Sequence, residues 1–279
     1  MRSVRVIGVG GGPLLTIPLS VSYCDFGFVC AGLRTRHNLH MESSNPDEKI
    51  LSYNDVVLRR SDLDILGGPH LLNDRIIEFY LSYLSSSHAS EDILLVPPSI
   101  SYWIMSCSLS ENLKEFVEPL HLPSRSLVLF PVNDNEDVHM AEGGTHWSLL
   151  VFERQTNMFI HHDSNGPGNR LPAFRLYNVI LKYMSDSGSA SNAGFTCSAS
   201  KARFTECTDI PRQVNGYDCG LYVTAIARVI CLWHSNNGNK ANDRSYLWFS
   251  AAKEQVTPSL VSEMRNEILG LIKDLMAKK

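Results

Sequence analysis

Residues 213–223, QVNGYDCGLYV, place Cys219 between a polar loop and a long apolar run. The segment that begins there, CGLYVTAIARVICLW, is apolar on nearly every side, which is typical of a buried helix. Cys219 would stand at the N-terminus of that helix, where free N–H groups and the helix dipole stabilise a thiolate. A lone cysteine is more often a small core residue, so its partners elsewhere decide between packing and catalysis.

Three segments in the middle of the chain, 126–134, 146–153 and 157–164, are rich in apolar and β-branched residues and predict strands. A short polar link joins the last two, which indicates an antiparallel hairpin. His146 at the start of one strand and Asp163 at the end of the next would then be neighbours, so that the carboxylate orients the imidazole beside a thiol nucleophile. Asp163 also precedes Asn165-Gly166, a turn signal, and both roles are compatible.

Gln213 has a role if Cys219 attacks a carbonyl, because a side-chain amide and the N–H of the nucleophile can hold the oxyanion. Taken alone, Gln213 would be a plain loop residue. His161 and His162 are adjacent in a predicted strand and point to opposite faces, which favours structural roles over a shared metal site. No metal and no other cofactor is expected.

Helices are expected on both sides of this central region, so strands and helices are segregated and the predicted class is α+β. The first helix can be capped by Asn73 or Asp74. The Ser/Gly-rich segment 186–200 is expected to be a flexible loop. The segments expected to be helical are 71–84, the stretch that starts at Pro97-Pro98, 177–185, the run from Cys219, and 259–279.

The chain has 279 residues, of which 44% are hydrophobic, enough for one large domain or at most two. A net charge of −4 without a clustered basic surface argues against nucleic-acid binding, and no window of about 18 apolar residues predicts a membrane span. Seven cysteines without a C-x-x-C pair predict neither a disulfide framework nor a structural zinc site. This pattern favours a reducing setting, with cytoplasm and nucleus expected.

Residues 1–48 are expected to be an N-terminal extension that is disordered or not part of the functional protein, and residues 49–279 the folded domain. The early arginines and the apolar stretch are like a weak targeting peptide, but Gly10–Pro13 interrupts it. Residues 42–50 have the polar composition of a linker. An upstream start, with Met41 beginning the functional protein, is the preferred interpretation.

The order His146, Asp163, Gln213, Cys219 resembles the ubiquitin-like-modifier proteases of the ULP/sentrin-protease family. The resemblance runs from about Leu51 to the C-terminus and is closest to the deneddylase branch, which acts on the NEDD/RUB modifier rather than on SUMO. It implies a papain-like α+β fold, a mixed sheet flanked by helices, with the catalytic cysteine at the N-terminus of a buried helix. The stretches that carry it are LSYNDVVLRRSDLDILGGPHLLNDRIIEFYLSYL, EPLHLP, VLFPVNDNEDVHMAEGGTHWSLLVF, HHDS and QVNGYDCGLYV.

The resemblance implies a triad of Cys219, His146 and Asp163 with Gln213 in the oxyanion hole, the same four residues that the physical argument selects. Trp147 matches the tryptophan that covers the Gly-Gly tail of the modifier in this family. A flat indole can press on a glycine backbone where a Cβ atom would clash. Without the resemblance, Trp147 would be a half-buried strand aromatic.

Two further positions concern substrate binding. Asp74 matches a residue expected to receive the basic tail of the modifier, although helix capping is an equally open role. The W-L-N-D motif of the family has a second tunnel tryptophan where this chain has Leu71. The roof of the glycine tunnel is therefore expected to be looser. The region around 185–200 reads as an insertion between Asp163 and Cys219.

The expected function is that of a cysteine isopeptidase, a monomer that removes NEDD/RUB from conjugated proteins such as cullins and processes its precursor. One alternative is a desumoylase of the same family. Another is an acetyltransferase on a related fold, which needs a basic cluster for the phosphates of coenzyme A, and no such run is found. The third is a non-catalytic modifier-binding module, which the complete triad disfavours and which Leu71 keeps open.

Overall fold

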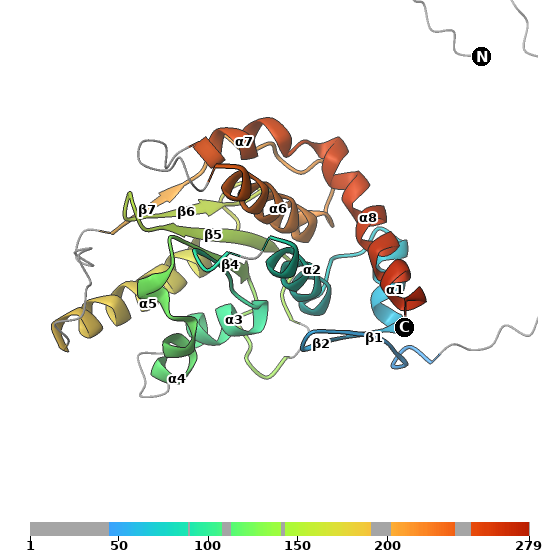
Figure 1. The fold of residues 1–279 in the computed structure, drawn as a ribbon, viewed down its shortest axis with the longest axis horizontal. Helices are drawn as coiled ribbons and strands as arrows, with labels where there is room; N and C mark the ends of the chain where they lie inside the picture. The colour runs from blue at the N-terminus through green and yellow to red at the C-terminus, as the bar shows by residue number, and fades with distance from the viewer. Residues whose placement is uncertain are drawn as a thin grey trace, which may run out of the picture. The chain divides into compact units, whose positions relative to one another are not determined.

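The chain forms a mixed five-stranded sheet with helices on both faces, together with a separate two-stranded hairpin (Figure 1). The predicted α+β class is confirmed. This computed structural model describes residues 45–88, 90–107, 113–140, 143–190, 202–237 and 247–278. No helix within these ranges is both long and apolar enough to cross a membrane. The expectations for residues 1–44, including the start at Met41, fall outside these ranges.

The central strands of the sheet are those that the sequence predicts. β5 and β6 form the expected antiparallel hairpin, with Leu149 opposite His162. β4 pairs with β5 antiparallel, while the edge strands β3 and β7 run parallel to their neighbours. The sheet order is β3 (Ile93–Leu95), β4 (Leu127–Asn133), β5 (Trp147–Glu153), β6 (Met158–His162) and β7 (Arg203–Glu206).

The sheet separates two hydrophobic cores, because successive strand residues point to opposite faces. Leu129 and Leu149 face one core, whereas Val128 and Leu150 face the other. Both faces are covered, so β4 and β5 read as continuous apolar runs. The first core is covered by the helices α1 (Arg60–Gly67), α2 (Asp74–Ser87), α6 (Cys219–Asn237), α7 (Leu247–Gln255) and α8 (Pro258–Ala277). The second core is covered by α3 (Pro98–Ser106), α4 (Leu113–Val117), the 3-10 turns η1 (Glu118–Leu120) and η2 (Leu122–Ser124), and α5 (Arg170–Ala190).

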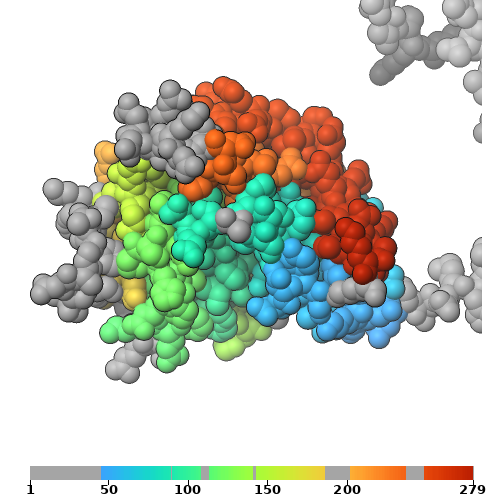
Figure 2. All heavy atoms as spheres, viewed as in Figure 1, coloured from blue at the N-terminus to red at the C-terminus, as the bar shows by residue number. Residues whose placement is uncertain are grey.

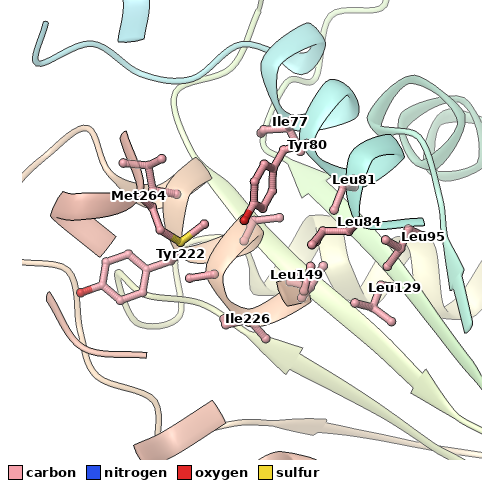
Figure 3. Close-up of a cluster of buried hydrophobic side chains, with 14 of the residues drawn as sticks. Ile77, Tyr80, Leu81, Leu84, Leu95, Leu129, Leu149, Tyr222, Ile226 and Met264 are labelled. Atoms are coloured by element: carbon pink, nitrogen blue, oxygen red, sulfur yellow. The ribbon is translucent and has the colours of Figure 1, made fainter. Parts of the chain in front are cut away.

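Helix α6 is buried, as predicted, because the sheet and three other helices surround it. Figure 3 shows Met264 of α8 next to Tyr222 of α6, with Tyr80 of α2, Ile226 of α6 and Leu149 of β5 in the same hydrophobic cluster. This setting explains why a helix begun by Cys219 is apolar almost all round. It also fixes the position of the helix N-terminus relative to the strand ends.

The N-terminal hairpin, β1 (Lys49–Tyr53) and β2 (Val56–Arg59), lies beside the C-terminal helix α8, as the blue and red atoms of Figure 2 show. The prediction that residues 42–50 form a linker is therefore wrong at its C-terminal end, because Lys49 and Ile50 belong to β1. The turn before the strand is tied to the domain through the Glu48 carbonyl, which accepts from the N–H of Arg60 at 2.9 Å.

Two helices begin or end differently from the expectation. Asn73, not Asp74, caps α2, since its side chain accepts from the N–H of Ile76 at 3.0 Å. Helix α5 starts seven residues before the predicted 177–185 and continues through residues 186–190, which were predicted to be loop. Intrinsic propensity is a weak guide where a helix is already anchored by packing, which explains this miss. Residues 191–201 fall outside the described ranges.

Candidate active site

His146 and Asp163 lie at the open end of the β5–β6 hairpin, one residue outside each strand. The expected contact is present: Nε2 of His146 lies 2.6 Å from Oδ1 of Asp163. Asp163 also accepts from the N–H groups of Asn165 and Asn169, both at 2.9 Å. The aspartate is thus a turn residue and a histidine partner at once, and the turn fixes the orientation of its carboxylate.

Burial and hydrogen bonding act in opposite directions on this pair. Burial disfavours the charged ring, but hydrogen bonds to Asp163 and Cys219 outweigh it and raise the pKa of His146 to about 10. For Asp163, burial opposes ionisation, and hydrogen bonds from His146 and the two backbone N–H groups lower its pKa overall. At neutral pH the pair is therefore an imidazolium and a carboxylate.

Cys219 is the first residue of α6, as predicted, and only 1% of its surface is exposed. Its side chain interacts with the His146 ring, which makes it the third member of the cluster. The next residue must be small, because a Cβ atom on Gly220 would lie 2.9 Å from the Cβ of Leu72. The first turn of α6 therefore packs directly on the segment that precedes α2.

Gln213 connects the loops that carry the acid and the nucleophile. Its Oε1 accepts from the hydroxyl of Ser164 at 2.8 Å, next to Asp163 in the chain. Its Nε2 donates to the carbonyl of Asn215 at 2.7 Å, and Asn215 in turn donates to Asp218, which precedes the cysteine. An amide nitrogen carries two hydrogens, so one donor remains for another acceptor.

A cavity of 480 Å³ is lined by the three residues that the resemblance assigns to substrate binding: Trp147, Leu71 and Asp74. The indole of Trp147 is 8% exposed and donates to the carbonyl of Leu72 at 2.8 Å. Leu71 is 36% exposed at the rim. Asp74 lies in the wall at the first position of α2, where its Oδ1 accepts from the N–H of Arg75 at 2.9 Å. The lining also includes three exposed apolar side chains, those of Trp103, Val138 and Met140.

The sequence interpretation missed Asn169. This residue is fully buried, and its side-chain nitrogen donates to the carbonyls of His146, at 3.1 Å, and Val132, at 3.2 Å. With its N–H on Asp163, it holds both members of the pair. Its position in NGPGN indicates only a turn, and the contacts that reveal its role join segments far apart in sequence.

Arg265 of α8 was also missed. Its Nη2 donates to Oδ1 of Asp218 at 2.9 Å, directly before the nucleophile. The one available signal was that Arg265 follows Met264, a residue predicted to lie on the buried face of the last helix. That signal does not identify a partner 47 residues away.

The two adjacent histidines take separate structural positions, as predicted. His161 bonds to Glu206 at 2.8 Å and to Ser148 at 2.9 Å. His162 packs against the ring of Trp248 on the other face. Within the described residues, no group of three or more His, Cys, Asp or Glu is arranged to hold a metal ion.

Comparison with known proteins bears on this arrangement. Residues 108–260 match the family described as "Ulp1 protease family, C-terminal catalytic domain". The chain is 52% identical over 238 residues to NEDD8-specific protease 1 of Arabidopsis thaliana, covering 85% of this chain and 98% of that protein. It is 32% identical over 235 residues to human sentrin-specific protease 8, covering 83% and 100%.

Solved structures share the fold. A SUMO protease Ulp1 with its catalytic cysteine oxidised to a sulfenic acid matches with a TM-score of 0.58 at 20% identity, over 82% of this chain and 90% of that one. A de-sumoylating protease matches with a TM-score of 0.61 at 15% identity, over 82% and 92%. The family expected from the sequence is confirmed: the chain belongs to the Ulp1 protease family of cysteine proteases, and within it resembles members named as NEDD8-specific proteases.

Proposed function

We propose that this protein is a cysteine isopeptidase that removes NEDD8, the NEDD/RUB modifier, from conjugated proteins and processes its precursor. The observation that carries the reaction class is the buried contact of His146 with Asp163, with Cys219 against the same ring. The choice of modifier is supported by the 52% identity to a NEDD8-specific protease across nearly the whole length of that relative.

The first half of the reaction is acylation. The thiolate of Cys219 adds to the carbonyl carbon of the terminal glycine of the modifier, and the electron pair moves to the oxygen. Collapse of this tetrahedral intermediate breaks the bond to the lysine nitrogen, and the imidazolium of His146 protonates the leaving amine. The products are a free amine, a thioester on Cys219 and a neutral His146.

The second half is hydrolysis of that thioester. Neutral His146 takes a proton from water, and the resulting hydroxide adds to the thioester carbonyl. Collapse breaks the carbon–sulfur bond and releases the modifier as its carboxylic acid, which gives its proton to solvent. Cys219 is left as the thiolate and His146 as the imidazolium. Throughout, Asp163 holds the ring in one orientation and stabilises its charged form.

The oxyanion of both tetrahedral intermediates is assigned to two donors. The N–H of Cys219 lies at a helix N-terminus, where backbone donors have no intrahelical partner. The side-chain amide of Gln213 is oriented by Ser164 and Asn215 and keeps a second hydrogen for the oxyanion. Loss of one such donor typically costs about 100- to 1,000-fold in rate.

The cavity beside the triad is assigned to the C-terminal tail of the modifier. Trp147 would press on the Gly-Gly backbone, and Asp74 would receive a basic side chain. Among the described lining residues, Asp74 is the one with a formal charge. That lining suits a tail with basic and apolar residues and disfavours the coenzyme A phosphates that an acetyltransferase must hold.

The decisive experiment is covalent labelling with NEDD8, SUMO and ubiquitin that carry a thiol-reactive C-terminal group. A NEDD8 adduct that disappears in Cys219→Ala is the expected result. A dominant SUMO adduct would keep the mechanism and overturn the modifier. No adduct with any of the three, from a protein shown to be folded, would favour the acetyltransferase or the non-catalytic module.

The wider setting is also a proposal. We propose that the protein acts as a monomer in cytoplasm and nucleus, with cullin conjugates among its substrates. The four cysteines in the described part of the chain are free thiols, which suits a reducing compartment. Light scattering would test the monomer, and the level of NEDD8-modified cullins after loss of the protein would test the substrate.

A further inference from the structure

Arg265 of α8 makes four hydrogen bonds to acceptors from two separate segments. Nη1 donates to the carbonyl oxygens of Ile65 and Gly68, both at 3.0 Å. Nη2 donates to the carbonyl of His70 at 3.0 Å and to Oδ1 of Asp218 at 2.9 Å. The arginine side chain is only 12% exposed and the aspartate side chain 7%. A planar fork with several fixed donors is the group that such a set of acceptors requires.

The carbonyl acceptors belong to the turn that leads into the cavity wall. Carbonyls at the end of a helix lack intrahelical partners, and Arg265 supplies donors just where α1 ends at Gly67. The chain then continues to Leu72, whose carbonyl holds the indole of Trp147 and whose Cβ lies against Gly220. Arg265 therefore holds the turn that leads to Leu72, and the carbonyl of Leu72 holds the indole of Trp147, which is proposed to cover the tail.

The carboxylate acceptor belongs to the nucleophile loop. While Oδ1 of Asp218 binds Arg265, its Oδ2 accepts from Nδ2 of Asn215 at 2.7 Å. Oδ1 of Asn215 accepts from the N–H of Asp218 at 3.0 Å, and its carbonyl holds Nε2 of Gln213. A continuous chain of hydrogen bonds thus runs from Arg265 to the proposed oxyanion donor, passing the residue directly before Cys219.

We propose that Arg265 is a positioning residue that sets the distance between the modifier-tail wall and the nucleophile loop. The inference rests on the proposed function, because the tail gives the wall its purpose. Arg265 acts through Asp218 and the 65–70 turn and takes no part in bond making. Its effect is on geometry: a misplacement of about 1 Å remote from the chemistry can lower the rate about 100-fold.

Lysine is the informative replacement. Arg265→Lys keeps the positive charge, but one ammonium cannot serve carbonyls of the turn and the carboxylate of Asp218 in the planar arrangement that the guanidinium provides. The matched control is Arg228→Lys. Arg228 of α6 donates to Oε2 of Glu267 in α8 at 2.6 Å and hydrogen-bonds Tyr80 of α2; none of these three residues lines the cavity or belongs to the 213–218 loop.

The test measures kcat, KM and thermal midpoint on the full chain, with NEDD8 carrying a fluorogenic C-terminal amide as substrate. Arg265→Lys is expected to lower kcat/KM about 100-fold, with kcat reduced and KM raised, while Arg228→Lys stays within about twofold of the parent. A kcat/KM for Arg265→Lys within about threefold of the parent would overturn the proposal. So would an equal loss in Arg228→Lys at an equal shift of the thermal midpoint.

Asp218→Asn keeps the inference testable if Arg265→Lys does not fold. The amide oxygen can still accept one hydrogen bond, but the carboxylate that joins Arg265 to Asn215 is gone. For Asp218→Asn we again expect kcat to fall and KM to rise. The double variant should lose no more kcat/KM than the more impaired single variant, because both substitutions break the same chain of hydrogen bonds. Additive losses in the double variant would overturn the proposal.

A second readout separates this inference from the choice of modifier. The rate at which iodoacetamide alkylates Cys219, followed by mass spectrometry from pH 5 to 10, requires no modifier. Arg265→Lys should shift this pH profile and Arg228→Lys should not. If the parent protein fails to hydrolyse NEDD8 but the shift is present, the proposed substrate is wrong and the positioning role stands; an unchanged profile overturns the role.

Discussion

His146 carries its proton between two acidic partners, and its chemistry depends on keeping that proton at neutral pH. Asp163 and Cys219 together raise the pKa of the ring to about 10 against the opposing effect of burial. In the proposed mechanism, the proton that the leaving amine needs is thus already in place when substrate binds. Asn169 adds rigidity, because one side chain and its N–H hold both the histidine and the aspartate.

The first prediction concerns the pH dependence that this residue imposes. kcat/KM for a NEDD8 C-terminal amide should fall as pH rises through about 10, since His146 then loses its proton. Stability should follow the same sign: the folded pKa lies above the ordinary value of 6.5, so the contribution is complete below pH 6.5 and is lost as pH approaches 10. Activity and urea unfolding from pH 6 to 11 measure both effects.

Asp163→Asn is the variant that tests the cause. Without the carboxylate, the hydrogen bond that most favours the charged ring is lost, so the basic limb should move to lower pH and kcat should fall about 100- to 10,000-fold. A basic limb that stays in place would show that Asp163 does not maintain the charge of His146.

The second prediction concerns Leu71, where the resemblance leads us to expect a tryptophan. Leu71 is 36% exposed on the cavity rim, so a larger ring there can cover more of the bound tail. Leu71→Trp should lower KM for NEDD8 substrates about 3- to 10-fold, with kcat changed less than about twofold. Leu71→Ala should raise KM. Equal KM values for all three proteins would mean that the tail does not reach this rim.

At the scale of elements, the sequence predicted those helices and strands whose formation depends on their own residues rather than on distant neighbours. The apolar run of α6, the strands β4 to β6 and their hairpin follow from periodicity and from a short polar link. The edge strands β3 and β7 and the short helices α1 and α4 carry little pattern of their own, because neighbours pack and pair them. α7 was missed as well.

Within the site, the same distinction separates what was predicted from what was missed. His146 and Asp163 meet because a hairpin brings strand ends together, which register predicts. Arg265 meets the carbonyl of Ile65 across 200 residues of chain, and no local pattern reports such a contact. Asn169 was missed for the same reason, since its partners lie on three different segments.

The third prediction tests the contact between α6 and the cavity wall. A methyl group on Gly220 would come within 2.9 Å of the Cβ of Leu72, which cannot swing away as a flexible side-chain end could. Gly220→Ala should therefore lower the free energy of unfolding by about 1–3 kcal/mol. It should also reduce kcat/KM, because Leu72 carries the carbonyl that holds Trp147. Chemical denaturation and steady-state kinetics measure the two effects.

Gly270 in α8 is the matched control, since a Cβ atom there would meet nothing within 4 Å. Gly270→Ala should leave kinetics unchanged and stabilise the protein by about 0.5–1 kcal/mol through helix propensity. If Gly220→Ala behaved like Gly270→Ala, the close approach to Leu72 would have no energetic consequence.

Across the whole molecule, the active site depends on both helical layers. Cys219 begins a helix of the first core, whereas Asn169 directly precedes α5 of the second. The ends of β5 and β6 lie between them and carry His146 and Asp163. The proposed triad therefore comes together only when both layers are docked on the sheet, so we expect activity to be a sensitive report of the global fold.

The fourth prediction concerns the acid stability of that fold and follows from His162, on the face of β6 that packs on α7. Burial lowers the pKa of its ring to about 3, and the neighbouring His161 adds to the effect. Both of its ring nitrogens are buried without a hydrogen-bond partner, between Trp248 and Phe249. Its folded pKa lies below the ordinary 6.5, so stability is complete above pH 6.5 and is lost as pH falls towards 3.

His162→Phe should remove this loss, because phenylalanine keeps the ring and cannot be protonated. We expect a shallower fall in the free energy of unfolding between pH 6.5 and 3, and a gain of about 1–3 kcal/mol at pH 7 from removing two unsatisfied polar atoms. Urea denaturation at pH 7, 5.5 and 4 measures both, with His139→Gln, an exposed site, as control. An acid slope identical to that of the parent would place the lability elsewhere, for example in the bonded pair of His161 and Glu206.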